Sequence, residues 1–249
     1  MIFIAIKIRK LENTGTKLIG LADLSFDDMF VLHEIKILSN KGEMFLAMPS
    51  RKTNTGFKGK NLDFTMINRC TKEMKLMLLK TIIASLMVLE EAGVVYGDMK
   101  PENIHVVYNP ATNSLRGLIY DLTDSYLERR PGKRDEVIGT TPYYSPELGK
   151  YIVESGKLDF LKLGEKRITT KSDIFAAAIV MHMYLTAGKM PGIPEKYNYV
   201  YEAVLDNCKP VIDPSIDKDV AYILDAMLAK RSTERPNAGQ VLNLLKDIV

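Results

Sequence analysis

The sequence predicts an α+β protein with an N-terminal antiparallel β-sheet and a mainly helical remainder. Within residues 2–48, short apolar runs alternate with polar turn residues, which is typical of strands joined in hairpins. Beyond residue 70, apolar residues recur at the three- and four-residue spacing of a buried helix face. With 249 residues and 46% hydrophobic composition, the chain is long enough for two small domains with their own cores.

Two hairpins account for the predicted sheet. The four predicted strands cover residues 2–10, 17–24, 30–38 and 44–48. The first pair flanks Asn13–Thr16 and the second flanks residues 40–42, and both turns contain Asn and Gly, which tolerate a positive φ. A polar, Gly-containing loop at residues 53–60 follows the sheet.

Three helices are expected in the remainder of the chain. A helix over residues 71–92 is predicted by apolar residues at helical spacing, and Gly93 ends it. Residues 171–187 predict a largely buried helix, with Asp173 near its N-terminus, where a carboxylate suits the helix dipole. An amphipathic final helix follows Arg235 and Pro236.

The charge distribution sets the N-terminal part apart from the rest. The net charge is +3, but residues 1–60 hold ten Lys and Arg against six Asp and Glu. Lys7, Lys36, Arg51 and Lys52 are candidate cations for nucleotide phosphates or for a nucleic-acid backbone. A solvated basic face is the alternative reading, and charge alone favours it.

Cysteine usage and hydropathy predict a cytoplasmic protein without a membrane partner. Cys70 and Cys208 lie far apart and show neither disulfide nor zinc-site spacing. We find no apolar run of membrane-spanning length and no signal-type N-terminus.

One short segment, residues 96–103, carries the residue types that phosphoryl transfer requires. In-line transfer needs a carboxylate to orient the attacking hydroxyl, a cation near the moving phosphoryl group and an amide oxygen on magnesium. Asp98, Lys100 and Asn103 fit these three roles. Asp121, directly after a short strand-like run, fits a second magnesium ligand. ATP and Mg²⁺ are therefore the expected cofactors.

Residues 71–249 resemble the C-terminal lobe of eukaryotic-like Ser/Thr protein kinases. The likeness rests on the loop at 96–103, on Asp121, and on three further blocks in family order, namely Gly139–Glu147, Lys171–Ala178 and Arg235–Pro236. By resemblance, Asp98 and Lys100 are catalytic, Asn103 and Asp121 hold magnesium, Thr141 bonds Asp98 and Lys100, Asp173 braces the catalytic loop, and Glu147 pairs with Arg235.

The N-terminal part lacks the Gly-rich hairpin and the strand Lys of a kinase N-terminal lobe. Residues 1–85 instead resemble the sporulation protein SpoVG family, on the blocks Ile6–Lys10, Phe26–Ile35 and Ala47–Thr53. That resemblance implies a small sheet-plus-helix domain that forms homodimers and binds nucleic acid. The sequence thus predicts a SpoVG-like sheet domain at 1–70, which replaces the kinase N-terminal lobe, and a kinase-like lobe at 71–249, with the helix at 71–92 shared.

Three functions are open at this stage. The first is an atypical Ser/Thr protein kinase that transfers the ATP γ-phosphoryl group to a protein substrate or to itself. The second is a pseudokinase fused to a nucleic-acid-binding module, which acts as a regulator or scaffold. The third is a small-molecule phosphotransferase, because Gly97-Asp98 resembles the His-Gly-Asp loop of antibiotic and choline kinases.

Overall fold

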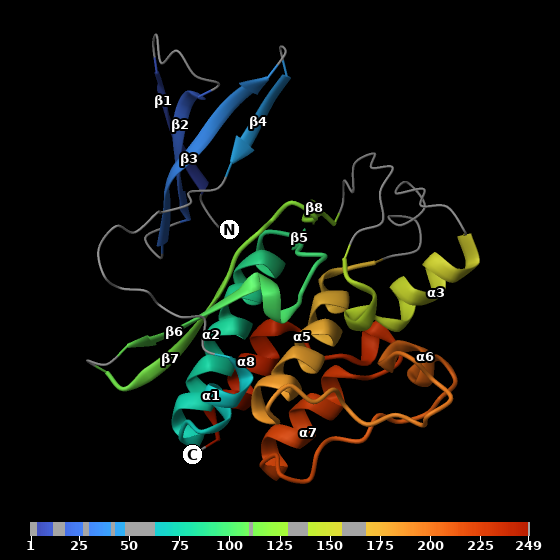
Figure 1. The fold of residues 1–249 in the computed structure, drawn as a ribbon. Helices are drawn as coiled ribbons and strands as arrows, with labels where there is room; N and C mark the ends of the chain where they lie inside the picture. The colour runs from blue at the N-terminus through green and yellow to red at the C-terminus, as the bar shows by residue number, and fades with distance from the viewer. Residues whose placement is uncertain are drawn as a thin grey trace. The chain divides into compact units, whose positions relative to one another are not determined.

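The chain forms two compact units, Met1–Lys58 and Gly59–Val249, and each is described by itself. The computed structural model describes residues 4–11, 18–26, 30–40, 43–47, 63–109, 112–128, 139–155 and 168–248 (Figure 1). The domain boundary drawn from the sequence, between residues 70 and 71, falls inside the second unit.

The first unit contains the four-stranded antiparallel sheet that the sequence predicts, in the order β1-β2-β3-β4. Its strands are β1 (Ile4–Lys10), β2 (Leu18–Phe26), β3 (Phe30–Asn40) and β4 (Glu43–Ala47). Consecutive strands pair throughout, as expected for two hairpins joined by a third antiparallel connection. The mixed α and β character is therefore confirmed.

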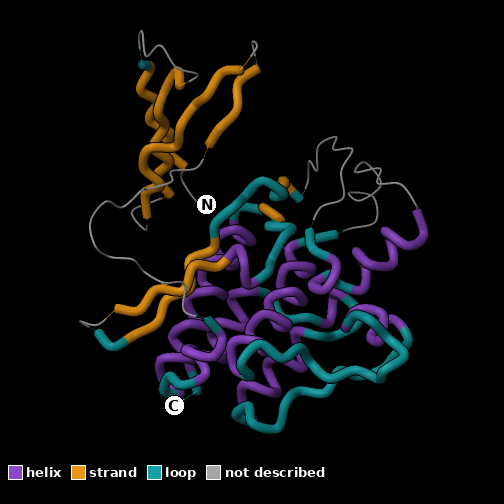
Figure 2. Tube along the Cα trace, in the orientation of Figure 1, coloured by secondary structure: helices purple, strands orange, loops and turns teal. Residues whose placement is uncertain are grey.

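Helices are the main regular structure of the second unit (Figure 2). They are α1 (Phe64–Asn68), α2 (Lys72–Glu91), α3 (Pro146–Ser155), α5 (Thr170–Leu185), α6 (Val200–Leu205), α7 (Lys218–Met227) and α8 (Ala238–Lys246). The two long helices predicted from the sequence, α2 and α5, are both present. Thr71 caps α2 by accepting a hydrogen bond from the Met74 N–H at 3.3 Å. α5 is buried along almost its whole length and packs against α2 and α7.

A hairpin between α2 and α3 positions the residues of greatest interest. Strand β6 (Ile104–Asn109) pairs with β7 (Ser114–Ile119), so that Ile104 lies opposite Ile119. β7 packs on α2, where the Gly117 N–H donates to Thr81 Oγ1 at 2.8 Å. A Cβ at Gly117 would lie 2.5 Å from an Ile82 side-chain atom, so only glycine allows this close approach.

Two shorter strands lie on either side of this hairpin in the sequence. β5 (Val94–Val95) and β8 (Tyr126–Leu127) form an antiparallel pair. Short 3₁₀ turns occur at η1 (Pro101–Asn103), η2 (Thr141–Tyr143) and η3 (Ser232–Glu234). None of the helices in the described residues has both the length and the apolar character needed to cross a bilayer.

His182, near the end of α5, is buried and fixes the chain that follows the helix. Its Nε2 accepts a hydrogen bond from the Asp213 N–H at 3.1 Å, and its Nδ1 lies 2.8 Å from the Lys189 carbonyl oxygen. These contacts require a neutral ring with its proton on Nδ1. Burial lowers the pKa of His182, although the Lys189 carbonyl and the Asp213 charge oppose that shift.

We expect the protein to lose stability as the pH falls below about 6.5, the pKa of His in an unfolded chain. Because the folded-state pKa of His182 is depressed, its contribution is complete above that value and is lost on further acidification. Denaturant titrations at about pH 7 and about pH 5, for the wild type and for His182→Gln, measure the effect. The variant cannot titrate at this position and should lose less stability; equal losses would contradict the assignment.

Candidate active site

The loop that follows β5 is held by Asp173 of α5, which lies 77 residues further along the chain. Asp173 Oδ2 accepts from the Tyr96 N–H at 2.8 Å, and Oδ1 accepts from the Gly97 N–H at 2.9 Å. Burial raises the pKa of Asp173 to about 7, and the two backbone N–H donors oppose this shift. Gly97 has a φ of +87°, a conformation that side chains rarely adopt. The loop therefore has one fixed backbone path.

Asp98 is buried at the centre of a polar network. Its Oδ1 accepts from Thr140 Oγ1 at 2.7 Å, and its Oδ2 lies 2.6 Å from Lys100 Nζ and 2.9 Å from Asn103 Nδ2. Lys100 Nζ also donates to Thr140 Oγ1 at 3.0 Å. Burial lowers the pKa of Lys100, but the hydrogen bond and charge of Asp98 outweigh this and raise it overall. Asp98 is thus held in one orientation beside a charged ammonium group.

The contacts that the resemblance assigned to Thr141 are made by Thr140. Thr141 begins the 3₁₀ turn η2, whereas Thr140 precedes the turn in an extended conformation with φ −119° and ψ 121°. That extended backbone directs the Thr140 hydroxyl to Asp98 and Lys100. The position predicted from the sequence is therefore one residue too late.

Asp121 lies at the same end of the β6–β7 hairpin as Asn103. Asn103 directly precedes β6 and Tyr120 directly follows β7, and the Tyr120 N–H donates to the Asn103 carbonyl oxygen at 3.1 Å. Asp121 has a φ of +63°, which is uncommon for a residue with a side chain and often marks a functional position. Hairpin pairing therefore brings together two residues that are 18 positions apart in the chain.

Thr123 fixes the side chain of Asp121, and sequence analysis did not assign it this role. Asp121 Oδ1 accepts from the Thr123 N–H at 3.1 Å and from Thr123 Oγ1 at 2.5 Å. These bonds lower the pKa of Asp121, and the charge of Lys100 lowers it further. The Asp-x-Thr spacing was the available signal, because a Thr two residues after an Asp can close a local turn.

A magnesium ion fits the chemistry of Asn103 and Asp121. In the part of the chain that the structure describes, no three or more Asp, Glu, His or Cys side chains form a metal site by themselves. Mg²⁺, however, commonly takes only one or two protein carboxylates and completes its octahedron with phosphate and water oxygens. The Asn103 Nδ2 donates to the Asp98 backbone and side chain, so its amide oxygen is the group available to a cation.

The segment after Thr140 is anchored by an ion pair between α3 and the chain before α8. Arg235 NH1 and NH2 each donate to one Glu147 oxygen at 2.7 Å. The Arg235 side chain is fully buried, and that of Glu147 is 19% exposed. Ser145 Oγ and Ser172 Oγ lie 2.8 Å apart and join the same segment to α5. The ion pair expected between Glu147 and Arg235 is thus present, and its role is structural.

The four candidate cations belong to the first unit. Lys7 is exposed on β1 and lies opposite Asp23, while Lys36 lies on β3. Arg51 and Lys52 lie outside the described residues. Arg9, Leu21 and Lys36 occupy directly opposed positions on β1, β2 and β3, and opposed positions share one face of a sheet. The positions of Arg9 and Lys36 therefore share one face of the sheet.

Comparison with known proteins assigns the N-terminal part of the chain to a protein family. Residues 1–86 match the SpoVG family. The chain is 35% identical over 89 residues to the septation protein SpoVG of Caldicellulosiruptor saccharolyticus, a match that covers 35% of this chain and 93% of that protein. The SpoVG proteins of Clostridium botulinum strain Alaska E43 and of Phytoplasma australiense are 43% and 47% identical over 51 residues, which is 20% of this chain and 55% and 52% of theirs.

Through these N-terminal residues, the chain belongs to the SpoVG family. It spans about half the length of the first curated relatives it matches. The family match ends inside α2, so it continues past the first unit and includes α1. The likeness of residues 71–249 to a kinase lobe stays a prediction from the motifs.

Proposed function

We propose that this protein is an atypical Ser/Thr protein kinase, with ATP and Mg²⁺ as cofactors, whose transferase site lies in the second unit. The observation that carries the proposal is the arrangement of Asp98, Lys100 and Thr140, with Asn103 joining Asp98 to the hairpin end that bears Asp121. A carboxylate, an ammonium group and two magnesium-type oxygen ligands are the groups that phosphoryl transfer requires. These groups come from two segments, residues 98–103 and Asp121, and Thr140 from a third segment contacts Asp98 and Lys100.

Each residue of the candidate site has a separate role in the proposed reaction. Asp98 orients the attacking hydroxyl and accepts its proton as the bond from that oxygen to the γ-phosphorus forms and the bond to ADP breaks. Lys100 places a positive charge beside the moving phosphoryl group. Asn103 and Asp121 are suited to hold Mg²⁺, which when bound neutralises phosphate charge. Thr140 keeps the Asp98 carboxylate and the Lys100 ammonium together.

Transfer of label from γ-labelled ATP tests the proposal. The purified full chain, with Mg²⁺ and a mixed protein substrate, should place label on Ser or Thr, and omission of Mg²⁺ should abolish the transfer. Asp121→Asn, prepared in the same way, excludes a contaminating kinase. Label that persists in this variant, or no label with the wild type, would overturn the proposal.

The second candidate function is a nucleic-acid-binding regulator without transferase activity. The shared sheet face of Arg9 and Lys36 and the family match of residues 1–86 favour it. Binding through phosphate contacts should weaken steeply with added salt. Salt-sensitive binding of DNA or RNA by a protein that shows no ATP turnover would select this function over the kinase.

Replacing Thr123 by Val is expected to raise the Mg²⁺ concentration that half-saturates the proposed transfer by about tenfold, since two hydrogen bonds hold Asp121 and the hydroxyl bond is lost. Thr123→Ser retains the hydroxyl and should stay near the wild type. Magnesium titrations of transfer rate for the three proteins measure the effect. Equal half-saturation in the Val and Ser variants would show that the hydroxyl does not position Asp121.

A further inference from the structure

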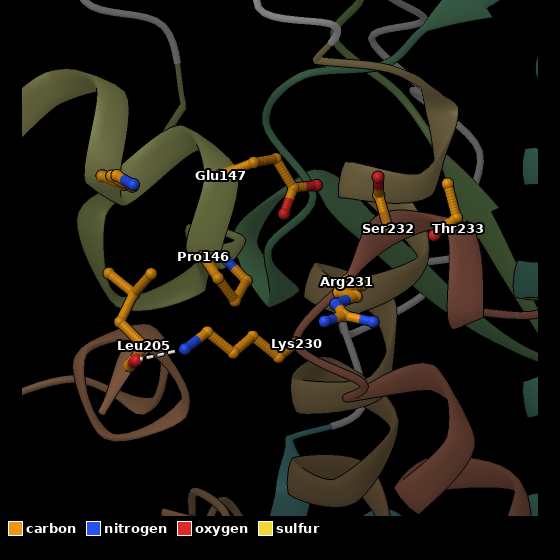
Figure 3. Close-up of a pocket in the computed structure, with 8 residues that line it drawn as sticks. Pro146, Glu147, Leu205, Lys230, Arg231, Ser232 and Thr233 are labelled. Carbon is orange, nitrogen blue, oxygen red and sulfur yellow. Dashed lines mark hydrogen bonds between the residues drawn. The ribbon is translucent and has the colours of Figure 1, made fainter. Parts of the chain in front are cut away.

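An open cavity of about 590 Å³ lies at the start of α3 (Figure 3). Its lining comes from α3, from the last residue of α6, from the two residues before η3 and from η3 itself: Pro146, Glu147, Lys150, Leu205, Lys230, Arg231, Ser232 and Thr233. Asp98, Lys100, Asn103 and Asp121 are absent from this lining. The cavity is therefore separate from the proposed transferase site, and its volume is within the range of ligand sites.

The cavity is strongly biased toward positive charge. Among the described residues of the lining, Lys150, Lys230 and Arg231 are cations and Glu147 is the one carboxylate. Both oxygens of Glu147 accept hydrogen bonds from Arg235, so its negative charge is already matched. A ligand in this cavity consequently meets an excess of cationic groups.

Two of these cations differ in how firmly they are held. Lys230 Nζ donates to the Leu205 carbonyl oxygen at 2.6 Å and to Asn207 Oδ1 at 2.9 Å, which fixes its ammonium group at the cavity wall. Arg231 makes one 3.3 Å ion pair with Glu234, and its side chain is 78% exposed. The remaining guanidinium N–H groups of Arg231 are therefore accessible to an incoming anion.

Hydroxyl and apolar groups complete the wall. Ser232 and Thr233 directly follow Arg231, and Figure 3 shows their side chains on the same side of the cavity as its guanidinium. Pro146 and Leu205 lie on the other side and supply apolar surface. A wall that carries an accessible guanidinium suits a phosphate group, and the apolar wall suits a neighbouring aliphatic side chain.

We propose that this cavity binds a phosphorylated Ser or Thr peptide. The phosphate lies against Arg231, on the side of the cavity that also carries Ser232 and Thr233, and an aliphatic residue of the peptide packs on Leu205, near the fixed ammonium group of Lys230. Recognition of phosphorylated peptides by Arg-containing clusters is an established mode of binding. Binding requires neither ATP nor turnover, so it can be tested independently of the proposed kinase activity.

Fluorescence anisotropy with the full chain tests this binding. The probe is a short labelled peptide with one phosphoserine flanked by leucines, compared with its unphosphorylated counterpart and with inorganic phosphate as competitor. Arg231→Ala should weaken binding about tenfold or more, the cost of a lost charge-assisted contact. Lys189→Ala is the matched control, because Lys189 also makes an exposed 3.3 Å ion pair, with Asp213, and lies outside the cavity.

The expected result is binding that needs the phosphate, falls in Arg231→Ala and is unchanged in Lys189→Ala. No binding, equal binding of the unphosphorylated peptide, or equal losses in the two variants would overturn the proposal. Inorganic phosphate that binds as tightly as the phosphopeptide would also overturn it, since the apolar wall would then contribute nothing.

Discussion

Replacing Asp98 by Asn is expected to lower the kcat of the proposed phosphoryl transfer on the order of 10²–10⁴-fold, the usual contribution of a general base. Asn has nearly the same shape and can still accept a hydrogen bond from Thr140. It cannot accept the substrate proton, and it removes the negative charge that lies 2.6 Å from Lys100 Nζ. The chemical step is therefore slowed, while the hydrogen bond from Asn103 to the carbonyl oxygen of residue 98 remains.

Binding of ATP with Mg²⁺ should survive in Asp98→Asn, because the proposed magnesium ligands are Asn103 and Asp121. Steady-state transfer rates and calorimetric titrations with ATP separate the two effects. Asp247→Asn, which changes an exposed carboxylate at the end of α8, is the control and should behave as the wild type. Transfer by Asp98→Asn at the wild-type rate would remove Asp98 from the mechanism.

Replacing Glu147 by Ala is expected to lower the free energy of unfolding by about 3–5 kcal/mol, the cost of leaving a buried charge without its partner. The Arg235 side chain is fully buried. Its other acceptors among the described residues are the carbonyl oxygens of Ala229, Lys171 and Lys230, at 2.8, 2.9 and 3.1 Å. Without Glu147, a cation remains in the interior among neutral acceptors.

Denaturant titrations of the two proteins measure this loss, with Glu234→Ala as the matched control. Glu234 also pairs with an arginine, Arg231, but their side chains are 53% and 78% exposed. Removing an exposed pair should cost no more than about 1 kcal/mol. Similar losses in the two variants would show that burial does not set the strength of the Glu147–Arg235 pair.

The sequence predicted the elements whose periodicity or turns were unambiguous. The sheet follows from two Asn- and Gly-containing turns, and α2 from twenty residues of helical spacing. The short helix α1 was missed because five residues carry little periodicity, although Asp63 supplied a capping signal by accepting from the Met66 N–H at 2.8 Å. The two-residue strands β5 and β8 depend on tertiary pairing, which no local pattern specifies.

In the candidate site too, residues that lie close together in the sequence were predicted, and a residue that is distant in the sequence was missed. Asp98, Lys100 and Asn103 were identified together because they lie within six residues of each other in the sequence. Thr140 was missed, since its contact with Asp98 spans 42 residues and depends on an extended backbone before a turn. The choice among the cations of the sheet stays open for a different reason: Lys7 and Lys36 belong to the other unit.

A crystal structure of the full chain with Mg²⁺ and a non-hydrolysable ATP analogue tests the central proposal most directly. We expect the metal to be bound by the Asn103 amide oxygen and the Asp121 carboxylate, with the terminal phosphate facing Lys100 and Asp98. Nucleotide bound elsewhere, or a site that stays empty at saturating nucleotide, would contradict the assignment of these residues to phosphoryl transfer.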